Sequence, residues 1–363
     1  MALKVGLVGL PNVGKSTLFN AISQAGAEAA NFPFCTIDPN VGVVAVPDAR
    51  LARLTELAHS ARTVPTVIEV VDIAGLVAGA SRGEGLGNQF LAYIREVDAI
   101  CNVVRCFEDD DVVHVDGSID PARDIEVVTT ELVLKDLETV EKRLERATRA
   151  AKGNDKTAVR ERDQVRALLD HLATGAVART FPGELDPGLA RELSLLTVKP
   201  VLYAANVAED ELPDGTDRVE VVRSIAAAEG AEVVVISAQV EAEVAELDGA
   251  ERTEYLATLG LERSGLERLI EHAYTLLGLR TFFTAGPKES RAWTVPAGST
   301  APRAAREIHT DFERGFIKAE VIAFDDYDRL GSEAAAREAG RLRIEGKDYV
   351  VADGDVIHFR FNV

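Results

Sequence analysis

The chain is poor in cysteine, in long apolar runs and in positive charge. Its 363 residues include only three cysteines, Cys35, Cys101 and Cys106, and no C-x-x-C pair, so the sequence indicates neither a disulfide framework nor a zinc site. No apolar run approaches the about 20 residues that span a bilayer. The first residues also enter an apolar segment without a charged, cleavable leader. We therefore expect a protein of the reducing cytoplasm.

The shortage of positive charge limits the partners of the chain. There are 40 Lys and Arg residues against 60 Asp and Glu residues, which gives a formal net charge of -20. A molecule with this charge does not bind nucleic acid through its overall electrostatic field, so any contact with RNA has to use a local patch. We expect no DNA and no membrane partner. The oligomeric state stays open, with a monomer as the default.

A phosphate-binding motif is the most informative feature that is present. Residues 9–16 read Gly-Leu-Pro-Asn-Val-Gly-Lys-Ser and fit the pattern G-x-x-x-x-G-K-[ST]. The apolar segment before them predicts a buried strand, and the segment after them predicts an amphipathic helix. The glycines let backbone N–H groups point at phosphates in front of the helix dipole. The sequence therefore predicts a nucleoside triphosphate site that uses Asn12, Val13, Gly14, Lys15, Ser16 and Thr17.

Lys15 and Ser16 have the roles that this motif requires. Lys15 would reach the β- and γ-phosphates and contribute to catalysis, and the Ser16 hydroxyl would bind Mg²⁺. A second element follows where the apolar strand of residues 66–71 ends in Asp72-Ile-Ala-Gly75. Asp72 at the strand end can hold Mg²⁺ through water, and the Gly75 N–H can meet the γ-phosphate. Thr36 could complete the Mg²⁺ shell.

Five glycines between Gly75 and Gly87 permit large backbone rearrangement, which is typical of a nucleotide-controlled switch.

Recognition of the base departs from the guanine-binding pattern Asn-Lys-x-Asp. After an apolar strand the chain reads Asn206-Val-Ala-Glu209, so the lysine is absent and the carboxylate is one methylene longer. This change disfavours bidentate binding of guanine and makes adenine plausible, because adenine presents a different donor and acceptor edge. We expect the backbone N–H groups at Ser237 and Ala238 to close the pocket. The predicted base-binding residues are Asn206, Val207, Glu209, Ser237 and Ala238.

The order of apolar and helical patterns predicts three parts. Strand-like segments alternate with helical ones up to about residue 130 and again from about 195 to 278, which is typical of a doubly wound α/β domain with a mostly parallel sheet. Residues 131–194 have a helical period with a charged face and read as an inserted helical hairpin. Residues 279–363 read as a small α+β domain that ends in two strands around an Asp353-Gly354 turn.

The helical insertion carries a local excess of positive charge. Between Lys142 and Arg166 there are nine basic residues and four acidic ones, a net of +5 in a chain of net charge -20. Such a zone predicts a surface for ribosomal RNA, with phosphate contacts supplying the affinity. An ion-paired helix surface is the alternative interpretation. The candidate RNA-binding residues are Lys142, Arg143, Arg146, Arg149, Lys152, Lys156 and Arg160.

Taken together, these motifs resemble the YchF (Obg-like ATPase) family over essentially the whole chain. The resemblance rests on the phosphate-binding loop with Asn12, the stretch from Asp72 to Gly87, the Asn206-Val-Ala-Glu209 loop and the C-terminal domain. It implies a Ras-like P-loop domain, a coiled-coil insertion and a ubiquitin-like β-grasp domain of the TGS type. It also implies ATP hydrolysis, association with the ribosome, and roles in translation or stress responses.

The resemblance also suggests how hydrolysis proceeds without the usual glutamine. Leu76 occupies the position where many Ras-like enzymes place a Gln that orients water, and Leu76 cannot hydrogen-bond water. The family suggests a K⁺ ion near the phosphates, held partly by Asn12, and His114 on an acidic loop as a catalytic group. An ordinary loop histidine is the alternative.

Two other functions remain compatible with the residues. One is a nucleotide-gated binding module with negligible turnover, because the glutamine is absent. The other is a GTPase of the Obg type, which holds if Asn206 and Glu209 still recognise guanine. We expect an ATPase with a slow intrinsic rate that ribosomes or K⁺ accelerate.

Overall fold

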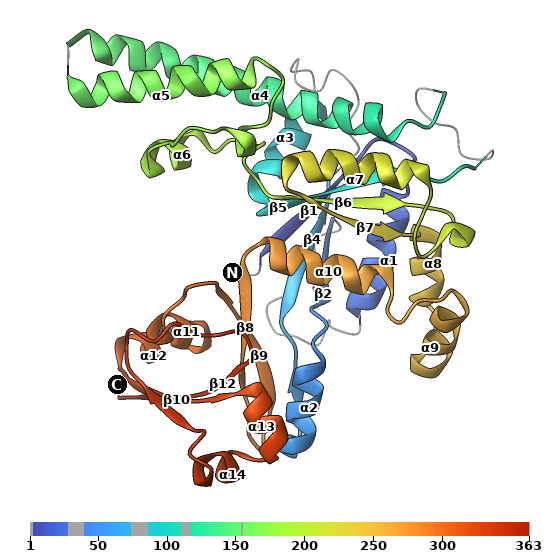
Figure 1. The fold of residues 1–363 in the computed structure, drawn as a ribbon, viewed down its shortest axis with the longest axis vertical. Helices are drawn as coiled ribbons and strands as arrows, with labels where there is room; N and C mark the ends of the chain where they lie inside the picture. The colour runs from blue at the N-terminus through green and yellow to red at the C-terminus, as the bar shows by residue number, and fades with distance from the viewer. Residues whose placement is uncertain (1–2, 28–39, 74–85, 110–116, 154, 363) are drawn as a thin grey trace. The chain divides into compact units, whose positions relative to one another are not determined.

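The computed structural model describes residues 3–27, 40–73, 86–109, 117–153 and 155–362. The chain forms two compact units (Figure 1). The first unit comprises residues 1–44 and 69–273, and the second comprises residues 45–68 and 274–363. Residues 45–68 are predicted to lie in the α/β domain, whereas in the structure they belong with the C-terminal residues.

A six-stranded sheet with the order β2-β4-β1-β5-β6-β7 forms the centre of the first unit. β4, β1, β5, β6 and β7 run parallel to one another. β2 runs antiparallel to β4, since Asp72 donates its N–H to the Asn40 carbonyl and Val46 donates to Thr66. The strands are β1 (Lys4–Val8), β2 (Val41–Ala45), β4 (Val67–Asp72), β5 (Ala99–Arg105), β6 (Val201–Asn206) and β7 (Glu232–Ile236). The predicted doubly wound α/β fold is confirmed.

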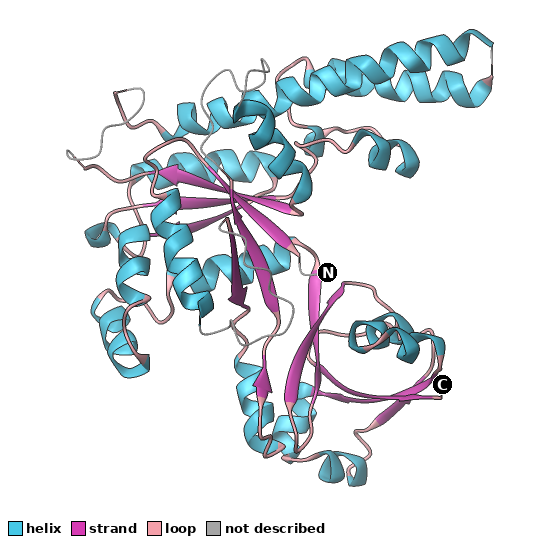
Figure 2. Ribbon diagram, turned by 180° about the vertical axis from the view of Figure 1, so that it is seen from behind, coloured by secondary structure: helices cyan, strands magenta, loops and turns pink. Residues whose placement is uncertain are grey.

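Helices cover both faces of this sheet (Figure 2). Every residue of β5 and β6 is buried, as expected for the central strands of a covered parallel sheet. The helices around the sheet are α1 (Lys15–Ala27), α3 (Leu86–Glu96), α7 (Asp217–Glu229), α8 (Ala238–Val244) and α10 (Gly265–Leu276), and α9 (Gly249–Thr258) packs on α8.

The predicted helical hairpin consists of α4 (Pro121–Ala150) and α5 (Lys156–Leu172), followed by the short α6 (Pro187–Leu193). α4 and α5 lie side by side (Figure 1). Their apolar faces bury a core that includes Val140, Val165 and Leu168. α4 begins before the predicted boundary at residue 131, because Asp120 caps the Arg123 N–H at 3.2 Å and a proline follows in the first turn.

Asp136 anchors α4 to the chain that leads into β6. Its carboxylate is 1% exposed and accepts hydrogen bonds from the N–H groups of Leu196 and Thr197, both at 2.8 Å, and from the Thr197 hydroxyl at 2.7 Å. Burial raises the pKa of Asp136, and the three donors oppose that shift. The hairpin is thus fixed to the α/β core by a fully hydrogen-bonded carboxylate.

The second unit is built on a second six-stranded sheet, in the order β11-β10-β12-β8-β9-β3. The β8–β9 hairpin, a helix, β10 and the final strand β12, which runs parallel to β8, form a β-grasp arrangement. This confirms the expected ubiquitin-like architecture. The strands are β3 (Thr63–Val64), β8 (Leu279–Thr284), β9 (Ser290–Pro296), β10 (Phe316–Ala323), β11 (Arg343–Glu345) and β12 (Asp355–Phe361).

Two layers of helices cover this sheet. α11 (Ala301–Ile308) and α12 (Thr310–Arg314) cover a core that includes Phe282, Phe316 and Phe359. A separate core, which includes Phe283 and Ile322, lies beneath α2 (Ala49–Leu57), α13 (Phe324–Leu330) and α14 (Glu333–Glu338).

One strand prediction in this unit is wrong. Residues 348–352 do not form a strand that returns on β12; they make one isolated bridge, between Val350 and Thr300. β12 instead pairs with β10 and β8. The Asp353-Gly354 turn is hydrogen-bonded to β8, because Asp353 accepts the Thr281 N–H and Gly354 donates to the Thr281 carbonyl, both at 2.8 Å.

Residues 45–68 are an integral part of the second unit. Leu51 and Leu54 of α2 are buried in the same core as Phe283 and Val356, and β3 extends the sheet by pairing with β9. The chain therefore leaves the first sheet after β2, contributes a helix and a strand to the β-grasp unit, and returns as β4.

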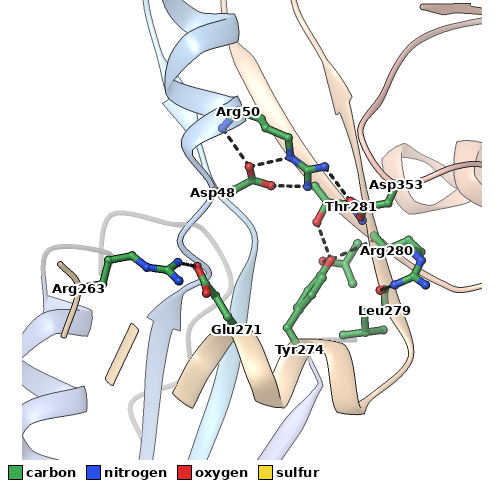
Figure 3. Close-up of polar contacts among 10 residues, drawn as sticks. Asp48, Arg50, Arg263, Glu271, Tyr274, Leu279, Arg280, Thr281 and Asp353 are labelled. Atoms are coloured by element: carbon green, nitrogen blue, oxygen red, sulfur yellow. Dashed lines mark hydrogen bonds and ion pairs between the residues drawn. The ribbon is translucent and has the colours of Figure 1, made fainter. Parts of the chain in front are cut away.

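Arg50 of α2 holds this insertion by a network of charged hydrogen bonds (Figure 3). Its guanidinium donates to Asp48 at 2.9 and 2.8 Å and to Asp353 at 2.7 Å. These carboxylates raise the pKa of Arg50. Asp353 in turn accepts the N–H of Thr281, so a single cation links α2 to the turn before β12 and to β8.

Replacement of Arg50 by Ala should destabilise the second unit. The variant leaves Asp48 and Asp353 without their cation, which we expect to cost about 1–3 kcal/mol. Urea unfolding followed by the fluorescence of Trp293, the single tryptophan of the chain, reports on this unit directly. Arg53→Ala on the same helix is the control, because Arg53 forms only exposed ion pairs with Glu56 and Asp328. Equal midpoints for the two variants would contradict the role of Arg50.

Candidate nucleotide-binding site

A cavity of about 650 Å³ lies at the carboxyl ends of the parallel strands of the first unit. Its lining comes from four segments that are far apart in the sequence: residues 10–17 after β1, 107–109 after β5, 206–208 after β6 and 237–239 after β7. The predicted phosphate-binding residues Asn12, Gly14, Lys15, Ser16 and Thr17 all line it. Val13 is the exception: it is 1% exposed and does not line the cavity.

Gly14 is required by the backbone of the phosphate-binding loop. Its φ of +92° is a conformation that side-chain-bearing residues rarely adopt, and a Cβ here would lie 2.2 Å from Nδ2 of Asn206. Asn12 also has a positive φ, of 64°, which asparagine tolerates better than most residues. The Gly14 carbonyl accepts the Leu18 N–H at 3.0 Å and so starts α1. The loop therefore curls directly into a helix N-terminus, as anion binding requires.

Lys15 and Asp72, predicted separately from two motifs, are in direct contact. The Lys15 ammonium is ion-paired with the carboxylate of Asp72, which ends β4 next to β1. Lys15 is 8% exposed, so this ion pair is largely shielded from solvent. Ser16 and Thr17 are exposed at the first turn of α1. The Ser16 hydroxyl and the Asp72 carboxylate supply the oxygen ligands that Mg²⁺ prefers, and the residues present therefore fit this ion.

Asn206 connects three of the loops around the cavity. Its side chain is 3% exposed, donates from Nδ2 to the Val13 carbonyl at 2.9 Å and accepts the Ala238 N–H at 2.8 Å. The amide thus ties the phosphate-binding loop to the segment after β7. The Ala238 N–H, which the sequence analysis assigns to the base, is engaged by Asn206 instead. Val207 and Ser237 are also buried beside the cavity, at 2% exposure each.

Glu209 is the predicted base-binding residue that does not line the cavity. Its carboxylate lies 3.2 Å from the Tyr255 hydroxyl of α9, and the same hydroxyl contacts Glu243 at 2.5 Å. Desolvation raises the pKa of Tyr255, and the carboxylates of Glu243 and Glu209 raise it further. Glu209 therefore lies with a polar cluster on α8 and α9.

Sequence reasoning missed the segment Phe107–Asp109 and Gln239, which also line the cavity. Arg105 holds that segment: it is 1% exposed, stacks 4.5 Å from the Phe107 ring centroid, and donates to the carbonyls of Phe107 and Asp109 at 3.3 Å. Because β5 adjoins β1 in the sheet, the end of β5 had to lie beside the phosphate loop. The rule that parallel strands end at one edge of the sheet could therefore have predicted that this segment lines the site.

Three predicted site residues, Thr36, Gly75 and His114, lie outside the described residues. Within the described part of the chain, no three His, Cys, Asp or Glu side chains gather to hold a metal ion by themselves. Mg²⁺ commonly completes its shell with phosphate and water oxygens, which is compatible with this arrangement.

The predicted RNA-binding residues of the helical hairpin fall into two groups. Arg143 pairs with Glu161 at 2.5 Å and Glu192 at 2.9 Å, while Lys142 and Arg149 pair with Glu138 and Glu145 along α4. The remaining four, Arg146, Lys152, Lys156 and Arg160, form no ion pair among the described residues.

None of the helices in the part of the chain that the structure describes combines the length and apolarity that a membrane span requires.

Comparison with known proteins gives a consistent picture over the full length. A family model described as "50S ribosome-binding GTPase" matches residues 4–148. A model for the C-terminal domain of YchF GTPases, described as "Protein of unknown function (DUF933)", matches residues 279–362. The chain is 57% identical over 366 residues to the ribosome-binding ATPase YchF of Bacillus subtilis (strain 168), with 100% of both chains covered. It is 55% identical over 364 residues to the ribosome-binding ATPase YchF of Escherichia coli O157:H7, again with 100% of both chains covered.

A solved structure of the YchF GTPase from Schizosaccharomyces pombe has the same fold, with a TM-score of 0.89 and 37% identity. The alignment covers 99% of this chain and 97% of that one.

A side chain at residue 14 should weaken nucleotide binding. Gly14→Ala combines a disfavoured φ with a clash against the Asn206 amide, so we expect the affinity for a fluorescent ATP analogue to fall by about tenfold or more. Gly230→Ala is the matched control: its φ is +67° but nothing lies within 4 Å of the added Cβ. That control should cost about 1 kcal/mol of stability and leave binding intact. Equal affinities of the two variants would refute the interlock between Gly14 and Asn206.

Proposed function

The chain belongs to the YchF family, and on this basis we propose that it is a P-loop ATPase that associates with the ribosome and modulates translation or the response to stress. The observation that carries the proposal is the cavity in which the Gly9–Ser16 motif meets the loops of Asn206 and Ala238. Relatives named ribosome-binding ATPases match the chain from end to end.

The ion pair between Lys15 and Asp72 indicates how a triphosphate would be received. Phosphate oxygens would compete with the Asp72 carboxylate for the Lys15 ammonium, and the N–H groups at the start of α1 would bind the same oxygens. Asp72 would then be free to orient water ligands of a cation. Binding of the nucleotide is thus coupled to an exchange of partners within the site.

Mg²⁺ bound by the Ser16 hydroxyl, and through water by Asp72, would neutralise charge that develops on the β- and γ-phosphates. Thr36 is the further ligand that we propose from the sequence. Lys15 would stabilise the same charge from the other side, and Gly75 would offer its N–H to the γ-phosphate.

Selectivity for ATP over GTP follows from what the Asn206-Val-Ala-Glu209 loop offers. Position 207 is a buried valine in place of the lysine that guanine binders use, and Glu209 is held by Tyr255 outside the cavity lining. The carboxylate of this loop, that of Glu209, therefore does not line the cavity in which the base would bind. Asn206, Val207 and the segment Ser237–Gln239 are left to bind the purine edge.

Hydrolysis needs a substitute for the glutamine that Leu76 replaces. We propose that His114 contacts the attacking water and that a K⁺ ion near Asn12 adds positive charge at the phosphates. Asn12 is exposed and lines the cavity, and its side-chain carbonyl oxygen is a suitable ligand for K⁺.

A second candidate function is a GTPase, because the matching family model and the solved yeast structure both carry that name. The absence of the lysine and the position of Glu209 speak against it. A binding module with negligible turnover is the third candidate.

Attachment to the ribosome would use the helical hairpin. Arg146, Lys152, Lys156 and Arg160 lack acidic partners among the described residues, and they are the members of the predicted patch that remain available for RNA phosphates.

Turnover measurements separate these functions. We expect the purified chain with Mg²⁺ to hydrolyse ATP faster than GTP, to do so faster in KCl than in NaCl, and to respond to added ribosomes. Faster hydrolysis of GTP would establish the GTPase. Binding of ATP without turnover in either salt, even with ribosomes, would establish the binding module.

Variants of Lys15 and His114 should separate binding from chemistry. Lys15→Ala removes the cation at the phosphates and should lower ATP affinity by about 100-fold. His114→Ala should leave affinity unchanged and lower the single-turnover rate by about 100-fold. His272→Ala, at an exposed histidine on α10, is the control and should match the wild type. An unaltered rate in His114→Ala would show that His114 is an ordinary loop histidine.

A further inference from the structure

A chain of polar contacts leads from the nucleotide cavity to Glu209. Gln239 of α8 lines the cavity, and its side-chain amide donates to the Glu243 carboxylate at 3.3 Å. The other oxygen of Glu243 accepts the Tyr255 hydroxyl of α9 at 2.5 Å, and the same hydroxyl lies 3.2 Å from an oxygen of Glu209. Three contacts therefore join the wall of the cavity to the acidic residue of the base-binding loop.

Glu209 is close to the base site but directed away from it. It directly follows Ala208, which lines the cavity, whereas Glu209 itself does not. Within the part of the chain that the structure describes, the Tyr255 hydroxyl is the one side-chain partner of Glu209. Because the Glu209 side chain is exposed and has several rotatable bonds, it can change direction without a change of the backbone.

The ring of Tyr255 is fixed by apolar packing. It packs against a core that includes Val244 of α8 and Leu256 of α9. Leu212, which follows the 3₁₀ turn Glu209–Glu211, packs against the same core. The Tyr255 hydroxyl therefore has a fixed position beside the loop that carries Glu209.

The hydroxyl serves its two carboxylates unequally. A phenolic O–H has one proton, so it cannot donate to Glu243 and Glu209 at the same time. The distances of 2.5 Å to Glu243 and 3.2 Å to Glu209 indicate that Glu243 is the main acceptor. The hold on Glu209 is therefore weak, and its loss should change a binding constant by about three- to tenfold.

The direction of the Glu209 carboxylate matters because it favours one purine. Guanine presents two adjacent donors, N1–H and the N2 amino group, which one carboxylate accepts together, whereas adenine presents an acceptor, N1, beside its single amino group. Backbone donors around the base are already engaged, since Ala208 donates to Glu211 at 2.9 Å and Ala238 donates to Asn206 at 2.8 Å. A carboxylate that faced the cavity would thus improve the binding of guanine in particular.

We propose that Tyr255 is a positioning residue that determines nucleotide specificity: its hydroxyl keeps Glu209 away from the guanine edge and so favours ATP. This role rests on the proposed ATP site and deepens it, because it places a determinant of base selectivity on α9, outside the segments that line the cavity. The alternative is that the composition of the Asn206–Glu209 loop sets the selectivity alone.

Removal of the hydroxyl tests this role. Tyr255→Phe keeps the packed ring and releases Glu209. In calorimetric titrations of the full chain with Mg²⁺, we expect its Kd for GTP to fall by about three- to tenfold and its Kd for ATP to change by less than about twofold. Glu209→Ala in the Tyr255→Phe background should cancel the gain. Tyr274→Phe, which removes a hydroxyl bonded to Thr281 in the second unit, is the control and should bind both nucleotides as the wild type does.

Glu243→Gln should act in the opposite direction. The amide competes less well than a carboxylate for the Tyr255 proton, so the hydroxyl donates more to Glu209 and holds it more firmly. We expect the Kd for GTP to rise by about threefold, with the Kd for ATP unchanged. A fall in the Kd for GTP in this variant would contradict the proposal, because a disturbance of packing does not predict opposite effects at Tyr255 and Glu243.

Three further outcomes would overturn the proposal: a wild-type ratio of the two Kd values in Tyr255→Phe, a gain for GTP that survives Glu209→Ala, or an equal change for both nucleotides, which would assign Tyr255 a structural role only. A wild-type chain that prefers GTP would refute the proposed ATP site. A wild-type preference for ATP with an unchanged ratio in Tyr255→Phe would refute only the role of Tyr255, so the two failures are distinguishable.

Discussion

The geometry of the nucleotide site depends on the side-chain amide of Asn206. It is almost completely buried, and its two hydrogen bonds join the phosphate-binding loop to the segment after β7. Each buried bond contributes about 1 kcal/mol net, but an unsatisfied partner would cost about 1–3 kcal/mol. The amide fits only because residue 14 has no Cβ. A glycine usually explained by phosphate contact is therefore also required by the protein's own packing.

The connection between β2 and β4 places a second constraint on the molecule. Between Asn40 and Asp72 the chain adds α2 and β3 to the β-grasp unit, with Leu51 and Leu54 in its core. The two units are therefore not consecutive modules. A truncation after residue 278 would leave the apolar face of α2 without its partners, so the β-grasp unit cannot be removed cleanly to obtain the nucleotide domain alone.

The sequence was most informative where local pattern and chemistry agree. The apolar runs of β1, β5 and β6, the phosphate loop and the aspartate at the end of β4 were all predicted, because each depends on a short segment and on the rule that parallel strands end at one edge. The prediction of a strand at residues 348–352 was wrong, since β12 pairs with β10 and β8 instead. A turn signal alone does not specify which strands pair.

The remaining differences between prediction and structure concern contacts between residues that are far apart in the sequence. Nothing near residue 209 in the sequence indicates that Tyr255 would engage its carboxylate, and nothing near residue 50 indicates Asp353 as its partner. The hydrophobic pattern of α2 predicts an amphipathic helix but not the sheet against which it packs. Such contacts depend on the fold as a whole. A single sequence therefore indicates which residues belong to the site better than it indicates which residues they contact.

The central claim is that the cavity around Asn206 is an ATP site. Calorimetric titration of the full-length chain with ATP and with GTP, at equal Mg²⁺, tests it most directly. We predict one site per chain, tighter binding of ATP than of GTP, and loss of both on replacement of Asn206 by Ala. Tighter binding of GTP, or undiminished ATP binding in Asn206→Ala, would contradict it.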